Sequence, residues 1–333
     1  MKRICIIYTG GTIGMERTVD GYKPGNEPFV DMMAKISDFS SPELPDYDVI
    51  EFSPLLDSSD ITVNEWNRMG RTIFEHRDEY DGFVILHGTD TMAYTASALS
   101  FILQNLQKPI ILTGSQIPLG EIRSDAKDNL IASMMIAASD EVSEVCLYFA
   151  GKLLRGNRAV KVSADTFIAF DSPNYPHLAE AGITIKYRDS VLKKKNDLAP
   201  VLKELTEEPV GVIKIFPGIQ IELFEPIITE KLTGVVLEAF GAGNVPNYCS
   251  ALEKIIKKAD EKGTVVVVCS QCPIGHVSIG TYAASNCLKG AVSGKDMTTE
   301  AAVAKLYYLF SCGYSKEKIK ELMEVDLCGE LDA

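Results

Sequence analysis

The stretch Ile4-Cys5-Ile6-Ile7-Tyr8, followed at once by Thr9-Gly10-Gly11-Thr12-Ile13-Gly14, indicates both the fold and the place of its chemistry. An uninterrupted apolar run of this length is typical of a strand that is buried on both faces, as in a parallel sheet. Ligands of open α/β sheets bind beyond the carboxyl ends of the strands. We therefore expect the glycine loop, with the hydroxyls of Thr9 and Thr12, to face a ligand.

This glycine loop matches neither of the common phosphate-binding motifs. A P-loop requires Lys followed by Ser or Thr after its second glycine, and the dinucleotide fingerprint requires G-x-G-x-x-G, whereas Gly10 and Gly11 are adjacent. A Gly-Gly pair after a strand is, taken alone, more often a turn that needs positive φ than a ligand site.

A second strand end repeats the arrangement. Phe83–Leu86 is apolar and leads into His87-Gly88-Thr89-Asp90-Thr91, after which the pattern predicts a helix from Met92 to Leu106. Asp90 is as consistent with a helix cap as with a functional carboxylate. Since the carboxyl ends of parallel strands share one edge of the sheet, the two loops together offer hydroxyls, a carboxylate and free amides.

The alternation of strands and helices predicts two α/β domains. The larger, 1–187, is expected to be a doubly wound, mostly parallel sheet, and the smaller covers 210–333. The charged segment 188–209 is predicted to connect them. Further strands are predicted at Pro109–Thr113, Val145–Phe149, 210–216, 234–238 and 264–269, and a further helix at Ala126–Ala138.

Composition narrows the class of protein. The 333 residues are 46% hydrophobic with a net charge of −13, which argues against nucleic-acid binding because phosphate contacts need a basic surface. The first apolar run is shorter than a signal-peptide core, and no stretch has the length of a membrane span. The eight cysteines lack the density of a disulfide scaffold. We expect a cytoplasmic protein with reduced thiols.

Metal and cofactor sites have little support in the sequence. Four histidines leave little room for a His-rich metal centre. Cys269-Ser270-Gln271-Cys272 is a C-x-x-C, but no second pair at zinc-finger spacing accompanies it. We expect neither a metal nor a cofactor.

Taken together, the two strand-end motifs resemble those of the bacterial-type L-asparaginases. Thr9-Gly10-Gly11-Thr12-Ile13-Gly14 and His87-Gly88-Thr89-Asp90-Thr91 are similar to the two signatures of that family, in its order and at its separation. The resemblance extends over the whole chain and is closest to the cytoplasmic type I branch. It implies hydrolysis of L-asparagine to L-aspartate and ammonia through an acyl-threonine intermediate.

The resemblance also implies roles for individual residues. Thr12 matches the nucleophile, Thr89, Asp90 and Lys161 match a second catalytic group, and Tyr22 matches the tyrosine of a mobile loop that closes over the site. From the sequence alone, Lys161 reads more simply as part of a solvated basic loop. Whether Lys161 serves as a base or as a charged organiser of Thr89 stays open.

The substrate of this family is a free amino acid, so its ammonium and carboxylate both need partners. Asp90 can pair with the ammonium, and by resemblance Ser58 binds the carboxylate between Asp57 and Ser59. The alternative is that Asp57–Asp60 is an ordinary cap for a helix around Glu65 and Trp66. Asn244, in Gly241-Ala242-Gly243-Asn244, matches an asparagine that a partner subunit supplies, which implies a homodimer or homotetramer.

One departure from the family concerns regulation. Type I enzymes with an asparagine effector site use an arginine where this chain has Glu238, and a hydroxyl residue where it has Val160. Cys272 is retained. A carboxylate cannot pair with the carboxylate of an effector, so homotropic activation by asparagine is not expected.

Other functions remain open at this stage. Asparagine and glutamine differ by one methylene, for which a pocket discriminates only about 10 to 200-fold, so minor glutaminase activity is expected. A non-enzymatic amino-acid sensor with the same pocket would not need Thr12, Thr89 or Lys161. A glutamine-hydrolysing amidotransferase subunit shares the catalytic core but carries an extra N-terminal domain, whereas eleven residues precede Thr12 here.

Overall fold

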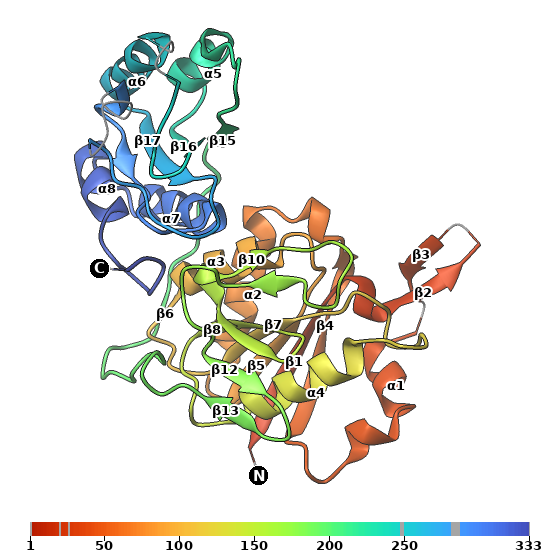
Figure 1. Ribbon diagram of the computed structural model, residues 1–333. Helices are drawn as coiled ribbons and strands as arrows, with labels where there is room; N and C mark the ends of the chain where they lie inside the picture. The colour runs from red at the N-terminus through yellow and green to blue at the C-terminus, as the bar shows by residue number, and fades with distance from the viewer. Residues whose placement is uncertain (1, 20, 26, 247–249, 281–286, 333) are drawn as a thin grey trace. The chain divides into compact units, whose positions relative to one another are not determined.

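The computed structural model describes residues 2–332 except 20, 26, 247–249 and 281–286, and the chain divides into two compact units (Figure 1). Unit 1 is Met1–Lys203 and unit 2 is Glu204–Ala333. The division falls inside the predicted connection 188–209. The part of that segment up to Lys203 belongs to unit 1, because Val191 and Leu192 pack against the core of this unit.

Unit 1 is built on an eight-stranded sheet in the order β13-β12-β9-β8-β7-β5-β1-β4. The five strands from β8 to β4 are parallel, whereas β9, β12 and β13 pair antiparallel. The prediction of a mostly parallel sheet is therefore confirmed. The strands are β1 (Arg3–Gly10), β4 (Asp46–Leu56), β5 (Gly82–Leu86), β7 (Ile110–Thr113), β8 (Val145–Phe149), β9 (Lys152–Arg155), β12 (Ala179–Ala181) and β13 (Ile185–Tyr187).

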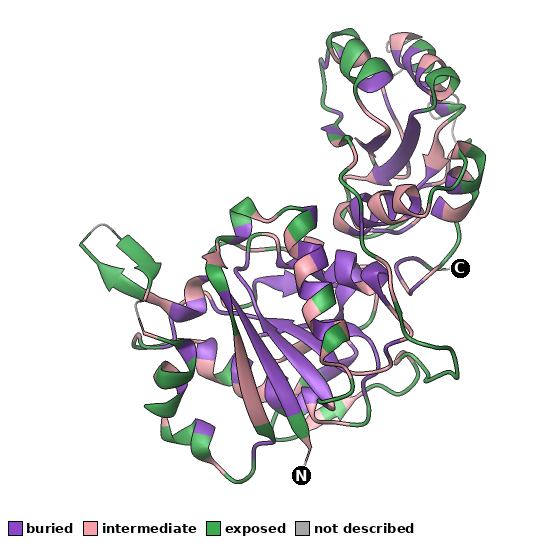
Figure 2. Ribbon diagram, turned by 180° about the vertical axis from the view of Figure 1, so that it is seen from behind, coloured by how far each residue is buried: buried purple, intermediate pink, exposed green. Residues whose placement is uncertain are grey.

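Helices cover both faces of this sheet, which confirms the doubly wound arrangement. On one face, Ile4, Ile6 and Tyr8 of β1 share a core with α1 (Phe29–Ala34) and α4 (Ala126–Ala137). Successive side chains of a strand point to opposite faces, so Cys5 and Ile7 lie on the other side. On that side α3 packs against β7 and β8, and α2 packs against α3. Seen from behind, the central strands are buried along most of their length (Figure 2).

The two helices of the second face are α2 and α3, and α3 ends earlier than the sequence predicts. Helix α2 (Val63–Glu75) begins with a capping box between Thr62 and Glu65. Helix α3 (Met92–Ile102) ends four residues before the predicted Leu106, so that prediction is wrong. The backbone leaves the helical conformation at Leu103, where φ is −105° and ψ is 70°. β6 (Leu103–Gln104) instead pairs with β14 (Val201–Leu202), and the φ of 55° at Asn105 prevents the helix from resuming.

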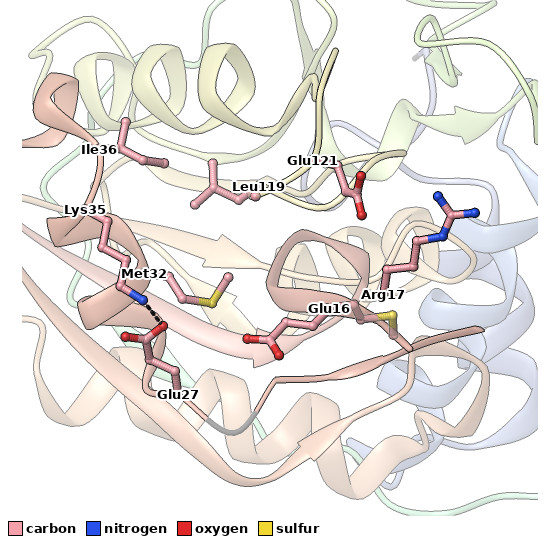
Figure 3. A pocket seen from close by; sticks show the side chains of 10 residues that line it. Glu16, Arg17, Glu27, Met32, Lys35, Ile36, Leu119 and Glu121 are labelled. Carbon is pink, nitrogen blue, oxygen red and sulfur yellow. Dashed lines mark hydrogen bonds and ion pairs between the residues drawn. The ribbon is translucent and has the colours of Figure 1, made fainter. Parts of the chain in front are cut away.

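A hairpin of β2 (Met15–Thr18) and β3 (Gly21–Pro24) follows the first glycine loop and projects from the body of unit 1 (Figure 1). A cavity of about 410 Å³ lies at its base. Met15, Met32, Ile36 and Leu119 form the apolar part of the lining, and charged side chains surround them (Figure 3).

Unit 2 is a smaller α/β domain, as predicted. Its parallel sheet has the order β15-β16-β17-β18, and Val235, Leu237, Val266 and Val268 contribute to the core between sheet and helices. Among the residues that the structure describes in either unit, no helix is both long and apolar enough to cross a membrane. The elements are β15 (Val210–Lys214), α5 (Glu225–Glu230), β16 (Gly234–Ala239), α6 (Ser250–Lys262), β17 (Val265–Ser270), β18 (Val292–Ser293), α7 (Thr299–Ser311) and α8 (Lys316–Met323).

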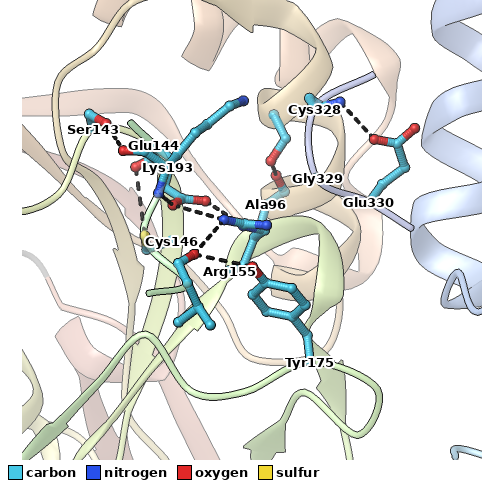
Figure 4. Close-up of polar contacts among 12 residues, drawn as sticks. Ala96, Ser143, Glu144, Cys146, Arg155, Tyr175, Lys193, Cys328, Gly329 and Glu330 are labelled. Carbon is cyan, nitrogen blue, oxygen red and sulfur yellow. Dashed lines mark hydrogen bonds and ion pairs between the residues drawn. The ribbon is translucent and has the colours of Figure 1, made fainter. Parts of the chain in front are cut away.

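A buried ion pair fixes the C-terminal segment of unit 2. Lys305 Nζ on α7 lies 2.6 Å from Glu330 Oε1, and both side chains are 0% exposed. Lys305 also donates to the carbonyls of Met323 and Val325, so each of its three N–H groups has an acceptor. The Glu330 carboxylate accepts from the backbone N–H of Cys328 at 2.8 Å (Figure 4). Both charges are therefore fully compensated.

We expect Lys305→Met to destabilise unit 2 by about 3 to 5 kcal/mol, because it leaves the Glu330 carboxylate buried without its counter-charge. Urea denaturation measures the change. Lys318→Met, which removes only an exposed ion pair with Glu321 on α8, is the matched control and should change the free energy of unfolding by less than about 1 kcal/mol. Equal losses in the two variants would contradict this account.

Candidate active site

Three loops at the carboxyl ends of β1, β5 and β4 meet at one point. A Cβ on Gly11 would lie 2.5 Å from the Gly88 nitrogen, and a Cβ on Gly88 would lie 2.5 Å from Ser58 Oγ. No side chain fits in either gap, and the φ of Gly11 is 86°, which favours glycine independently. The glycines therefore permit backbone contact between the two motifs that the sequence predicted to converge.

The two hydroxyls of the first loop have different surroundings. Thr9 is buried, and its Oγ1 donates to the Leu86 carbonyl at 2.8 Å, which ties β1 to β5. Thr12 begins a single 3-10 turn, Thr12–Gly14, directly after Gly11 and is half-buried. Only Thr12 combines solvent access with a position beside the second loop.

The second loop holds a cluster of three polar side chains. Lys161 Nζ donates to Thr89 Oγ1 at 2.9 Å and to Asp90 Oδ1 at 2.6 Å. The Lys161 side chain is 20% exposed and that of Asp90 is 67% exposed. Asp90 is not a helix cap, since Thr91 occupies that position in α3. The simpler interpretation of Lys161 as part of a solvated loop is also wrong.

A buried ion pair supports the segment that leads to Lys161. Arg155, at the end of β9, donates from Nε to Glu144 Oε2 at 2.6 Å, and its guanidinium lies over the ring of Tyr175 (Figure 4). Five residues after Arg155, β10 (Val160–Lys161) begins and pairs with β11 (Phe170–Asp171). Lys161 therefore lies on a short strand that follows a buried ion pair and is itself paired with β11.

Gln116 belongs to the same cluster, although the sequence analysis did not single it out. Its Oε1 accepts from Thr89 Oγ1 at 3.5 Å, and its Nε2 donates to the Thr166 carbonyl at 3.1 Å. The carboxylate of Asp125 accepts from the backbone N–H of Gln116 and so holds the residue. The available signal was the Gly114-Ser115-Gln116 sequence after β7, a third strand that ends in small polar residues.

Ser58 lies in a 3-10 turn, Ser58–Asp60, after β4. It is 5% exposed, and its carbonyl accepts from Thr91 Oγ1 at 2.6 Å, which joins this turn to the second loop. Asp57 caps this turn by accepting from the N–H and hydroxyl of Ser59. Because Thr62 caps α2, the alternative that Asp57–Asp60 is the cap of that helix is wrong.

Two predicted site residues are not brought into this cluster. Tyr22 lies on β3 of the projecting hairpin and is 47% exposed. Asp20 and Asn26, which are close to Tyr22 in the sequence, lie outside the described residues. Asn244 lies in unit 2, where its side-chain Oδ1 is buried and no described residue forms a hydrogen bond with it.

The other residues considered from the sequence have ordinary surroundings. Glu238, at the end of β16, accepts from Thr299 Oγ1 at 2.7 Å. Cys272 is exposed and Cys269 is buried, and burial raises the pKa of the Cys269 thiol to about 12. Among the described residues, no three His, Cys, Asp or Glu side chains are grouped to bind a metal ion.

His87, which precedes Gly88, is fully buried. Burial lowers the pKa of this imidazole from 6.5 to about 4, although a hydrogen bond with the Gly88 carbonyl acts in the opposite direction. The side chain is therefore neutral at physiological pH.

Comparison with known proteins places both units in one family. Residues 3–193 match the sequence model described as asparaginase, N-terminal, and residues 209–323 match the glutaminase/asparaginase C-terminal domain. L-asparaginase 1 of Escherichia coli (strain K12) is 44% identical over 332 residues, which cover 99% of this chain and 98% of that protein.

Solved structures show the same similarity. L-asparaginase I of Vibrio cholerae aligns with a TM-score of 0.92 at 44% identity, over 100% of this chain and 99% of that one. The thermostable L-asparaginase of Thermococcus kodakarensis aligns with a TM-score of 0.90 at 31% identity, over 99% of each chain.

We expect the free energy of unfolding to fall as the pH is lowered from about 6.5 to 4. In this range the unfolded chain protonates His87 and the folded protein does not, so stability is lost, and the contribution of this group reaches about 3 kcal/mol at pH 4. Urea denaturation of the wild type and of His87→Gln tests this. The variant should show a shallower slope than the wild type between about pH 6.5 and pH 4. A wild-type slope in His87→Gln would contradict the assignment.

Proposed function

This chain belongs to the asparaginase family and hydrolyses L-asparagine to L-aspartate and ammonia, and we propose that Thr12 makes the attack. The observation that carries this proposal is the meeting of Gly11, Gly88 and Ser58. It sets the loop of Thr12 against the loop of Thr89, where Lys161 and Asp90 supply charge.

The proposed reaction has two steps through a covalent intermediate. Thr12 Oγ1 attacks the side-chain amide carbon, its proton passes to a neighbouring base, and the amide nitrogen leaves as ammonia after it is protonated. Water then attacks the resulting ester, which releases L-aspartate and restores the Thr12 hydroxyl. Free backbone N–H groups of the glycine loops are suited to stabilise the oxyanion in both steps.

Lys161 serves as a charged organiser in this proposal. An ammonium offers three donors, and two of them are directed to Thr89 and Asp90. Thr89 Oγ1 accepts from Lys161 and donates toward Gln116, so its hydroxyl has a defined orientation. The lysine thus fixes the second hydroxyl of the site and balances the charge of Asp90.

The ends of the substrate are bound by different loops. The exposed Asp90 carboxylate uses Oδ1 for Lys161 and leaves Oδ2 for the substrate ammonium. Ser58, flanked by Asp57 and Ser59, binds the substrate carboxylate.

Asn244 completes the site from the second subunit of a homodimer or homotetramer. Its buried side-chain oxygen has no hydrogen-bond partner among the described residues, which is consistent with a role that requires another molecule.

The hairpin that carries Tyr22 acts as a lid. A backbone hydrogen bond from the Gly25 N–H to the Gly14 carbonyl joins the base of the hairpin to the turn of Thr12. The hairpin therefore pivots at a point close to the proposed nucleophile. Closure brings Tyr22 over Thr12 and excludes bulk water during acyl transfer.

Several further properties belong to the same proposal. The protein acts in the cytoplasm on a free amino acid, without a cofactor, and hydrolyses glutamine slowly. Its net charge of −13 argues against a nucleic-acid partner, because phosphate contacts require a basic surface.

Regulation and alternative functions follow from other residues. Glu238 makes activation by asparagine at a second site unfavourable. A sensor or an amidotransferase subunit is the alternative, and release of ammonia from asparagine by the isolated chain separates both from an asparaginase.

We expect Thr12→Ala to lower kcat for asparagine by about 10⁴-fold or more, because no other group replaces a lost nucleophile. Ammonia release measures turnover, and calorimetry should show that aspartate still binds. Thr12→Ser, which keeps the hydroxyl, should retain measurable activity. Activity of Thr12→Ala within tenfold of the wild type would remove Thr12 from the mechanism.

We expect Tyr22→Phe to lower kcat by about 10²-fold, the scale of a small misplacement of the reacting groups when the lid closes less firmly, while the free energy of unfolding stays within about 0.5 kcal/mol. Only the hydroxyl of an exposed side chain is removed. Tyr314→Phe, at a comparably exposed tyrosine of unit 2, is the control and should leave both quantities unchanged. Unchanged kinetics in Tyr22→Phe would exclude Tyr22 from the reaction.

A further inference from the structure

A chain of buried hydrogen bonds runs from α2 through α3 to the loop of Thr89. Trp66 Nε1 lies 3.0 Å from Thr95 Oγ1, and Thr95 Oγ1 lies 2.9 Å from His87 Nε2. His87 Nδ1 lies 2.6 Å from the Gly88 carbonyl oxygen. Thr95 and His87 are 0% exposed. The chain thus crosses the interior and ends one residue before Thr89.

Only one assignment of protons satisfies every member of this chain. The Trp66 indole can only donate and the Gly88 carbonyl can only accept. His87 must therefore carry its proton on Nδ1, which leaves Nε2 as an acceptor for the single hydroxyl proton of Thr95. Burial keeps this imidazole neutral, so it does not gain a second proton that would reverse the bond with Thr95.

The last member of the chain lies at the most crowded point of the site. Gly88 has no room for a Cβ on the side of Ser58, and its nitrogen lies only 2.5 Å from the position that a Cβ on Gly11 would take. The backbone N–H of His87 donates to the Thr113 carbonyl at 2.9 Å, which fixes the other side of the residue. These contacts do not determine the direction of the Gly88 carbonyl. The His87 imidazole determines it through the hydrogen bond from Nδ1 to this carbonyl oxygen.

We propose that Trp66, Thr95 and His87 are positioning residues, which hold the peptide between Gly88 and Thr89 so that Thr89 Oγ1 meets Lys161 and the substrate. The proposal rests on the proposed role of Thr89 in catalysis. These three side chains act on turnover through the peptide that they hold, without touching the substrate. If they served only to pack the core, their loss would affect stability and not turnover.

Thr95→Val tests the proposal with nearly constant volume. Valine removes the donor to His87 and the acceptor for Trp66, and a displaced catalytic hydroxyl should lower kcat by about tenfold or more while KM stays within about threefold. Thr95→Ser keeps the hydroxyl and should restore kcat to within about threefold of the wild type.

The matched control is Thr264→Val in unit 2. Thr264 is likewise a buried threonine, and its hydroxyl donates to the Leu232 carbonyl at 2.8 Å. This variant should lose stability and keep kcat. A kcat of Thr95→Val within twofold of the wild type, or a loss of kcat that Thr95→Ser does not repair, would overturn the proposal.

Nitrogen NMR of ¹⁵N-histidine-labelled wild-type protein tests the geometry without any variant and without activity. The chain has four histidines, and each gives two ring-nitrogen signals. The pair of signals that is missing from the spectrum of His87→Gln belongs to His87. We expect His87 to be neutral with its proton on Nδ1 from pH 7 down to about pH 5. A proton on Nε2, or a charged imidazole at pH 7, would overturn the proposal even if Thr95→Val fails to fold. If Thr12→Ala were fully active, the proposed mechanism would fail while the NMR result stood.

Discussion

The contact of two glycine backbones, Gly11 and Gly88, is the constraint on which the site depends. Parallel pairing of β1 with β5 brings both loops to the same edge of the sheet, but pairing alone would leave side chains between them. Without a Cβ on either residue, the chains approach until one hydroxyl loop lies against the other. The residues that we propose for catalysis are then placed by backbone that is fixed on both sides.

Charge is added to this frame by elements that lie far away in the sequence. Lys161 comes from a short strand after β9, which the buried pair of Arg155 and Glu144 supports, and it orients both Thr89 and Asp90. The interior contributes through neutral groups, since His87 and Thr95 connect the helices to the Gly88 carbonyl. The loop of Thr89 is held by these contacts, whereas the hairpin of Tyr22 is exposed, as its proposed role as a lid requires.

Local sequence patterns were sufficient to predict those strands and loops whose structure depends on neighbouring residues in the chain. The apolar runs predicted β1, β5 and β8, and the two strand-end motifs were correctly expected to lie at the same edge of the sheet. Residues whose environment depends on distant segments could not be read in this way. Lys161 looked like a surface residue, Gln116 carried no distinctive signal, and α3 ended early because β6 pairs with a strand about a hundred residues later. The role of His87 required knowledge of Trp66 and Thr95 from two different helices.

The most direct test of the central claim asks which threonine carries the acyl group. Turnover of L-asparagine would be quenched with acid at short times, and the peptides containing Thr12 and Thr89 would be examined by mass spectrometry for an aspartyl ester. The account predicts an adduct on Thr12 that is absent in Thr12→Ala. An adduct on Thr89, or a burst of ammonia without any adduct on Thr12, would contradict it.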